Sequence, residues 1–196
     1  MFYEPHKRDR SLLPHDPFKA LIAPRPVGWI STCGTKGEIN LAPYSFFNAF
    51  SGEPPSVGFC SEGFKDSAYL AKESGEFVWN LASYDLRDQM NATSAPLPRG
   101  SSEFLHAGLE MADCVIVKAP RVKAAPASLE CKVTQIVRLD ALDAVQTDRY
   151  LVLGQVVGVH LNEACLRDGV MDITLMKPIA RCGYQDYVVV DKVFSI

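Results

Sequence analysis

The sequence predicts a mainly β protein, built as an antiparallel, Greek-key-like barrel with a few short helices. Most of its apolar runs are five to eight residues long, rich in β-branched and aromatic residues, and separated by turn residues. The helical segments between these runs are too few for a regular β–α–β alternation. An antiparallel barrel accommodates such a pattern, and a parallel α/β sheet does not.

The apolar runs give the expected strands. A turn at Gly34–Gly37 predicts a hairpin between the first two runs. In the run from Leu129, apolar residues alternate with Glu130, Lys132 and Thr134, which indicates a strand with one solvent-exposed face. Gly154 and Gly158 interrupt the last run and suggest bends of the kind that barrels need. The expected strands cover residues 27–33, 39–44, 56–60, 76–82, 114–119, 129–139 and 150–161.

Helices are expected at three places. Asp66 and Ser67 precede a short helical segment that Gly75 ends, so this helix has about two turns. Residues 85–94 and a turn near 101–108 are the other candidates.

Length and composition point to one domain of residues 18–196, preceded by a polar, proline-rich arm of residues 1–17. The formal net charge of −3 gives no reason to expect a nucleic-acid or anionic-membrane partner. The N-terminal residues lack the apolar run of a signal peptide, and no run approaches membrane-spanning length, so we expect a cytoplasmic protein with reduced thiols. The six cysteines and four histidines are scattered without metal-ligand spacing, and we expect no metal site.

The sequence shows no motif of standard catalytic machinery. It contains no glycine-rich dinucleotide or phosphate loop, no nucleophile elbow and no zinc-protease motif. We therefore assign no catalytic residue, and we expect a cofactor to carry the reaction if the protein is an enzyme.

An ordered set of motifs resembles the flavin reductase-like family of FMN-binding split barrels. Residues 24–59 read PRPVGWISTCGTKGEINLAPYSFFNAFSGEPPSVGF, and they are followed by Lys65-Asp66-Ser67, where the family has Lys-Asp-Thr. Further matches are EFVWNL (76–81), LEC (129–131), LGQVVGVH (153–160) and KPIARCGYQDY (177–187). The resemblance covers most of residues 18–187 and implies a split β-barrel that binds FMN.

The resemblance also implies where the flavin lies. The ring and ribityl chain would contact the strand end at Ser31 and Thr32 and the polar residues of the 45–51 stretch. Lys65 and Ser67, at a helix start whose N–H groups favour an anion, would hold the phosphate, with Asp66 capping the helix. Trp29 either borders the flavin or belongs to the core. Arg181 would lie near the flavin or nicotinamide. The predicted cofactor-binding residues are Trp29, Ser31, Thr32, Ser45, Asn48, Ala49, Ser51, Lys65, Asp66, Ser67 and Arg181.

Several alternatives stay open. Phe46, Phe47 and Phe50 are interpreted as plain core residues, and the alternative is that they anchor a loop whose polar groups face the flavin. Glu130 is interpreted as the outward position of an alternating strand, and the alternative is an acid near the pocket. Arg25 contacts the phosphate, a partner subunit or only solvent.

The expected function is that of an NAD(P)H-dependent flavin reductase, an FMN-binding oxidoreductase. The first alternative is a flavoredoxin-type electron carrier that does not use NAD(P)H directly, because ARCGYQDY has no histidine where many relatives carry one. The second is a flavin-binding domain without turnover. The resemblance implies a homodimer with each flavin close to the partner chain, and the electron acceptor, a small molecule or a protein, stays open.

Overall fold

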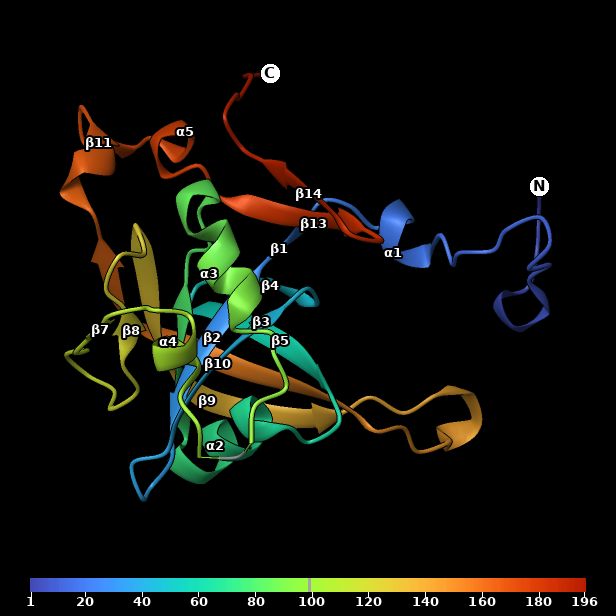
Figure 1. Ribbon diagram of the computed structural model, residues 1–196, viewed down its shortest axis with the longest axis horizontal. Coiled ribbons are helices and arrows are strands. Elements are labelled where there is room, and N and C mark those ends of the chain that lie inside the picture. Colours follow the sequence, from blue (N-terminus) through green and yellow to red (C-terminus); the bar gives the residue numbers. More distant parts are fainter. Residues whose placement is uncertain (99) are drawn as a thin grey trace.

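The computed structural model describes residues 1–98 and 100–196 and confirms the mainly β fold. Its centre is a seven-stranded antiparallel sheet in the order β3-β2-β6-β9-β10-β5-β4, curved around an apolar interior (Figure 1). The strands of this sheet are β2 (Gly28–Cys33), β3 (Ile39–Tyr44), β4 (Phe47–Gly52), β5 (Pro55–Glu62), β6 (Glu76–Asn80), β9 (Ala127–Arg138) and β10 (Arg149–Leu161).

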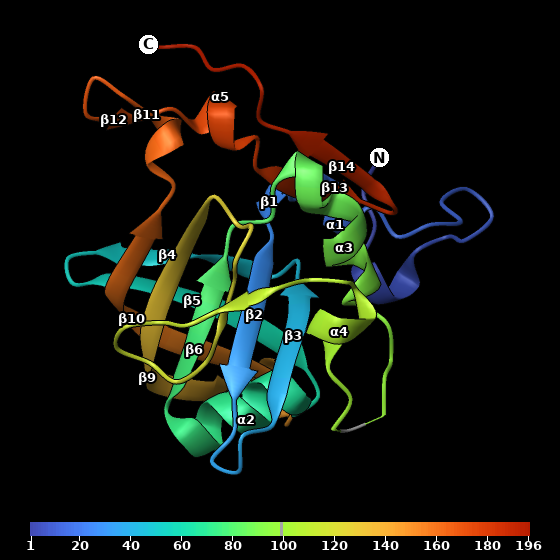
Figure 2. The same ribbon diagram turned by 60° about the vertical axis from the view of Figure 1, so that its left-hand side comes forward.

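Shorter elements close the two ends of the barrel. Figure 2 shows α2 at one end and the β13–β14 hairpin, beside α3, at the other. The remaining strands are β1 (Arg25–Pro26), β7 (Met111–Ala112), β8 (Arg121–Val122), β11 (Leu166–Arg167), β12 (Val170–Met171), β13 (Ile179–Gly183) and β14 (Asp186–Val189). The helices are α1 (Phe18–Leu21), α2 (Asp66–Ser74), α3 (Arg87–Ala92), α4 (Glu103–His106) and α5 (Ile173–Met176), with 3-10 turns η1 (Pro5–Lys7), η2 (Tyr84–Leu86), η3 (Leu142–Ala144) and η4 (Glu163–Cys165).

The predicted hairpin, bends and helices are confirmed. The β2–β3 turn closes with a hydrogen bond from the Gly34 N–H to the Glu38 carbonyl, and α2 ends at Gly75, whose φ is 74°. Register shifts in the β9–β10 pairing fall at Gly154 and Gly158. A Cβ on Gly154 would lie 2.5 Å from the Phe77 ring, so the strand can bend over this ring only without a side chain there.

Two apolar cores lie on opposite faces of β2. Ile30 faces the barrel interior with Phe59 and Phe77, whose rings meet edge to face at 5.5 Å. Trp29 faces the outside and packs in a second core with Phe104, under the short helices α3 and α4. Because both faces of β2 are covered, its burial does not alternate.

The run 114–119 is a loop, and its prediction as a strand is wrong. Its backbone N–H groups pair with two carboxylates instead of a neighbouring strand. Val115, Ile116 and Val117 donate to Glu130 over 2.6–2.9 Å, and Lys118 donates to Glu76 over 2.5 Å. The apolar run satisfied the strand pattern, but these hydrogen bonds fix a different backbone path.

Glu130 is buried, which corrects its interpretation as an outward-facing residue. Only 1% of it is exposed, and His160 Nε2 lies 2.7 Å from its Oε1. Burial opposes ionisation, yet the three backbone N–H groups and His160 outweigh it and lower the Glu130 pKa to about 2. Lys132 and Thr134, predicted on the same face, are exposed as expected.

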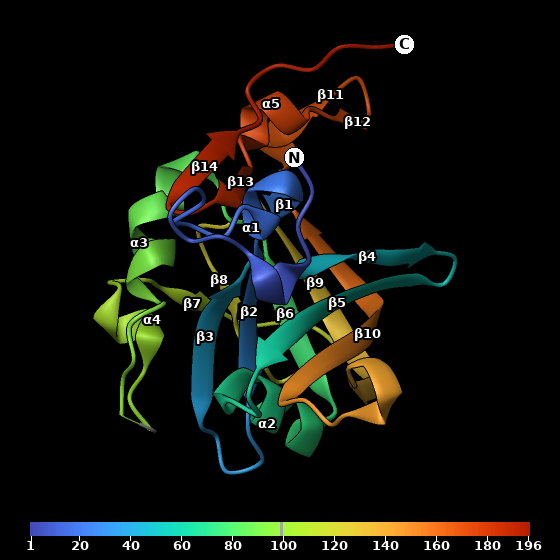
Figure 3. The same cartoon turned by 90° about the vertical axis from the view of Figure 1, so that its right-hand side faces the viewer.

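The stretch 45–55 forms part of an edge hairpin, β4–β5, that projects from the barrel (Figure 3). Phe47 is half-buried and stacks on Trp79 at 5.7 Å. Phe46 and Phe50 are exposed, so their interpretation as core residues is wrong. Local sequence could not tell an edge strand with apolar residues from a core segment.

The chain ends extend from this body. Residues 1–17 run away from the barrel (Figure 1). The His15 ring packs edge-on against Tyr184 at 5.9 Å. Among the residues that the structure describes, no helix combines the length and apolar character needed to span a membrane.

Candidate functional site

A groove follows β3 from the start of α2 to the β13–β14 hairpin. It consists of two adjoining cavities of about 580 Å³ and 390 Å³ that share Pro43, Tyr44 and Ser94 as walls. We call them the hairpin-end cavity and the α2-end cavity. The first is also lined by Lys19, Arg25, Val27, Ser45, Met90, Asn91, Arg181, Gly183, Tyr184, Gln185 and Tyr187, and the second by Asn40, Ala42, Lys65, Asp66, Ser67, Thr93, Ala95, Pro96, Leu97 and Glu103.

The α2-end cavity combines a helix start with polar side chains. The first N–H groups of α2 have no partner within the helix, and Lys65 is the residue before it. The Ser67 side chain is buried, and its Oγ accepts a hydrogen bond of 2.7 Å from Asn40 Nδ2. The helix dipole, a lysine and a hydroxyl together favour an anion here.

The helix cap differs from the prediction. Lys65 occupies the N-cap position, and Asp66 is the first residue of the helix. Asp66 therefore does not cap α2, although its charge lies in the first turn, where the helix dipole favours an acidic residue.

Tyr44 connects the two cavities. Its ring packs against Phe59 at 4.7 Å, at an angle of 43°. Burial raises the pKa of Tyr44 although hydrogen bonds to the Ser67 and Ser61 hydroxyls oppose this effect. The phenol is thus protonated at neutral pH, so Tyr44 can donate as well as accept a hydrogen bond.

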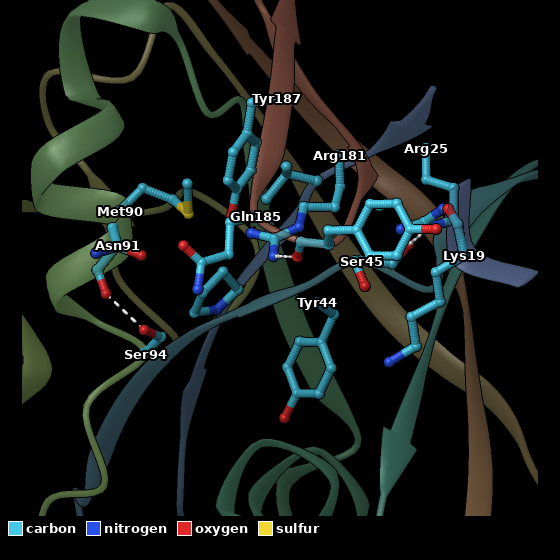
Figure 4. Close-up of a pocket in the computed structure, with 14 residues that line it drawn as sticks. Lys19, Arg25, Tyr44, Ser45, Met90, Asn91, Ser94, Arg181, Gln185 and Tyr187 are labelled. Atoms are coloured by element: carbon cyan, nitrogen blue, oxygen red, sulfur yellow. Dashed lines mark hydrogen bonds between the residues drawn. The ribbon is translucent and has the colours of Figure 1, made fainter. Parts of the chain in front are cut away.

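Two arginines shape the hairpin-end cavity (Figure 4). Arg25 is buried, and its guanidinium donates to the Ser45 carbonyl at 3.2 Å and to the Lys19 and Ile22 carbonyls. Arg181 lies with its guanidinium carbon 4.5 Å from the centre of the Tyr187 ring. Arg25 therefore ties the segment at Lys19 and Ile22 to Ser45, whereas Arg181 presents a cation at the groove.

The structure brings five of the predicted residues to this groove: Ser45, Lys65, Asp66, Ser67 and Arg181. Sequence reasoning missed Asn40, Ala42 and Tyr44. These three alternate along β3 and so share one face of the strand. That alternation, directly before the predicted Ser45, was the signal that could have found them.

Trp29, Ser31 and Thr32 lie behind the groove wall and line neither cavity. Trp29 is fully buried, and its indole N–H donates to Thr93 Oγ1 at 3.0 Å, which ties α3 to β2. Ser31 Oγ donates to the Pro120 carbonyl at 2.6 Å. The buried Thr32 hydroxyl makes no hydrogen bond with the part of the chain that the structure describes.

Asn48, Ala49 and Ser51 lie outside the groove, exposed on β4. Asn48 Oδ1 accepts from the Ala49 N–H at 2.9 Å, and Ser51 Oγ donates to the Glu53 carbonyl at 3.2 Å. β4 and β3 are the two edge strands at opposite ends of the sheet order, and of the predicted residues in the 45–51 stretch only Ser45, before β4 begins, lines the groove.

Cys114, Glu130 and His160 place three potential metal-ligand atoms within 4.8 Å of one another. Both Glu130 oxygens already accept hydrogen bonds. Burial, with the negative charge of Glu130, raises the pKa of the Cys114 thiol to about 12. These donors suit a structural hydrogen-bond network better than a metal centre.

The curved antiparallel sheet with its short helices places the chain in the class of split barrels. The chain belongs to the family described as the flavin reductase like domain, whose model matches residues 21–174. An uncharacterized protein of Aquifex aeolicus is 33% identical over 86% of this chain and 85% of its own length.

Solved structures show the same relationship. Nitrilotriacetate monooxygenase component B from Bacillus cereus superposes with a TM-score of 0.89 and 28% identity, over 100% of this chain and 98% of that one. Flavoredoxin of Desulfovibrio vulgaris shares the fold with a TM-score of 0.77, at 19% identity and over 88% and 90% of the two chains. Membership of the family supports a flavin cofactor and a flavin-related oxidoreductase.

Proposed function

We propose that this protein is an FMN-binding oxidoreductase that transfers a hydride from NAD(P)H to flavin N5. The observation that carries the proposal is the continuous groove from the start of α2, past Tyr44, to Arg181. An anion-favouring end, a long polar channel and a broader aromatic end match the phosphate, ribityl chain and ring of FMN. The residues present therefore fit this cofactor.

The groove residues have separate tasks in this proposal. Lys65, Ser67 and the first N–H groups of α2 bind the phosphate. Arg181 stabilises the negative charge that develops on the ring after hydride transfer. When bound, FMN supplies the hydride acceptor and the onward electron transfer. No side chain needs to act as a general base.

A flavoredoxin-type electron carrier is the second candidate. No histidine is among the described residues that line the hairpin-end cavity, where the chain presents Arg181, Tyr184 and Tyr187 instead. This lining favours a protein that receives electrons from a partner and not from a nicotinamide.

The visible spectrum of the FMN-loaded protein tests both candidates. We expect bound FMN to bleach within seconds of anaerobic addition of NADH or NADPH. Bleaching by dithionite alone would contradict the reductase and support the carrier. Failure to bind FMN would contradict both.

We also propose that two copies associate through the β4 edge. An apolar depression of about 630 Å³ there is lined by exposed residues, including Leu21, Ile22 and Phe50, and it shares Arg25 and Ser45 with the groove. Unpaired strand edges and apolar surface both favour association. A second copy seated here would lie beside the flavin groove.

Sedimentation equilibrium checks this proposal. The unmodified chain is expected at twice its monomer mass, and Phe50→Asp is expected to shift it toward the monomer. Val193→Asp, in the exposed C-terminal tail, serves as the matched control. A monomeric unmodified chain would contradict the proposed dimer.

A further inference from the structure

The buried hydroxyl of Ser67 is in contact with a fixed hydrogen-bond donor. The Asn40 amide nitrogen, which can only donate, lies 2.7 Å from Ser67 Oγ. A second buried serine, Ser61, donates from its Oγ to the Gly63 carbonyl at 2.7 Å. The Tyr44 side chain is close enough to both serines that their hydroxyls counteract the rise in its pKa that burial causes.

The Asn40 contact limits where the Ser67 proton can point. Asn40 Nδ2 occupies an acceptor position of Ser67 Oγ, so the Ser67 proton must point to another group. Ser67 lines the α2-end cavity, and its proton can point into that cavity.

The side chains of Asn40, Ser61 and Ser67 are held in place by burial. Asn40 is 8% exposed, Ser61 0% and Ser67 1%, so solvent does not compete for these hydrogen bonds. Asn40 and Tyr44 come from the same face of β3, whereas Ser67 belongs to α2. The network thus joins the sheet to the helix start.

We infer that Asn40 is a positioning residue that makes the groove select a phosphorylated flavin, because its amide N–H occupies one lone pair of Ser67 Oγ and turns the Ser67 proton away from Asn40, toward the α2-end cavity. This inference rests on the proposed FMN site. The oxygens of a phosphate accept hydrogen bonds, so a hydroxyl proton that Asn40 already turns toward the cavity reorients little when the phosphate binds. Riboflavin has no phosphate and does not use this donor.

The experiment compares the dissociation constants of FMN and riboflavin by quenching of flavin fluorescence. Four forms of the full chain are titrated: unmodified, Asn40→Ala, Ser67→Ala and the double variant. Ser67→Ala is expected to weaken FMN binding about tenfold, because hydrogen bonds to charged groups are the stronger ones. Asn40→Ala is expected to weaken FMN binding about fivefold, and both variants to leave riboflavin binding within about twofold.

The double variant distinguishes a positioning role from an independent contact. If Asn40 acts through Ser67, the double variant binds FMN no more weakly than Ser67→Ala alone. The inference would be overturned if the losses of FMN affinity in the two single variants multiply in the double variant. It would also be overturned if riboflavin affinity falls as much as FMN affinity. Unchanged FMN binding in Asn40→Ala would also overturn it.

Asn162→Ala is the matched control. Asn162 also makes one side-chain hydrogen bond, to the Ala164 N–H, but it caps η4 near β11, at the opposite end of the molecule from α2 (Figure 1). The ratio of the FMN and riboflavin dissociation constants of this variant should equal that of the unmodified chain. If the unmodified chain binds both flavins equally well, the phosphate selection fails while flavin binding stands. Binding of neither would overturn the proposed function as well.

Discussion

Replacing Glu130 by alanine is expected to lower the free energy of unfolding by roughly 3–5 kcal/mol. The substitution leaves three backbone N–H groups of the 114–119 loop and the His160 ring without their shared acceptor. Glu130→Gln is also expected to destabilise, because its amide N–H₂ would face those N–H groups. Urea unfolding followed by tryptophan fluorescence measures the free energy of unfolding of both variants.

The same network makes stability depend on pH. The Glu130 pKa falls from 4.5 in the unfolded reference to about 2 in the fold, so its stabilisation of about 3 kcal/mol is fully present above pH 4.5. It is lost as pH falls through about 2. The difference in free energy of unfolding between the unmodified chain and Glu130→Gln should therefore become smaller from pH 5 to pH 2.

Glu163→Ala is the control for both measurements, because this exposed glutamate should change stability by no more than about 0.5 kcal/mol. A Glu130→Gln variant as stable as the unmodified chain at pH 7 would contradict the role of the carboxylate.

Replacing Lys65 and Ser67 together by alanine is expected to weaken FMN binding about 100-fold, since each loses a contact to a charged phosphate. Binding of riboflavin should change little, because the removed groups would meet only the phosphate. Equilibrium titration by flavin fluorescence gives both constants.

The opposite end of the same helix provides the matched control. Lys72→Ala with Ser74→Ala removes the same two residue types from the last turn of α2, away from the groove. This double variant should retain FMN affinity. If the Lys65 and Ser67 double variant binds FMN as tightly as the unmodified chain does, the phosphate lies elsewhere.

The fold was predictable wherever local pattern decides the structure. Short apolar runs, the turn at Gly34–Gly37 and the glycines of β10 each act through their own backbone, and the structure confirms them. The loop 114–119 was not predictable, because its backbone partners Glu76 and Glu130 are brought beside it only by the folded sheet.

The candidate site was predictable in part for the same reason. Lys65, Asp66 and Ser67 form a contiguous motif at a helix start, and all three line the groove. Trp29 satisfied the strand pattern equally well as a core residue and as a groove residue, because β2 has a core on each face. Which face holds the groove depends on α3, α4 and β13, far along the chain.

The loop held by Glu76 and Glu130 has a consequence for the evolution of this surface. A carboxylate that accepts hydrogen bonds from backbone N–H groups makes the same bonds whichever side chains those residues carry, proline excepted. Val115 is 86% exposed and Ile116 49%, so almost any residue can replace them while the loop keeps its path. At positions 115 and 116 only proline, which lacks the N–H group, is barred. This part of the surface is therefore free to change its chemical character, through drift or by design, on a backbone that stays constant.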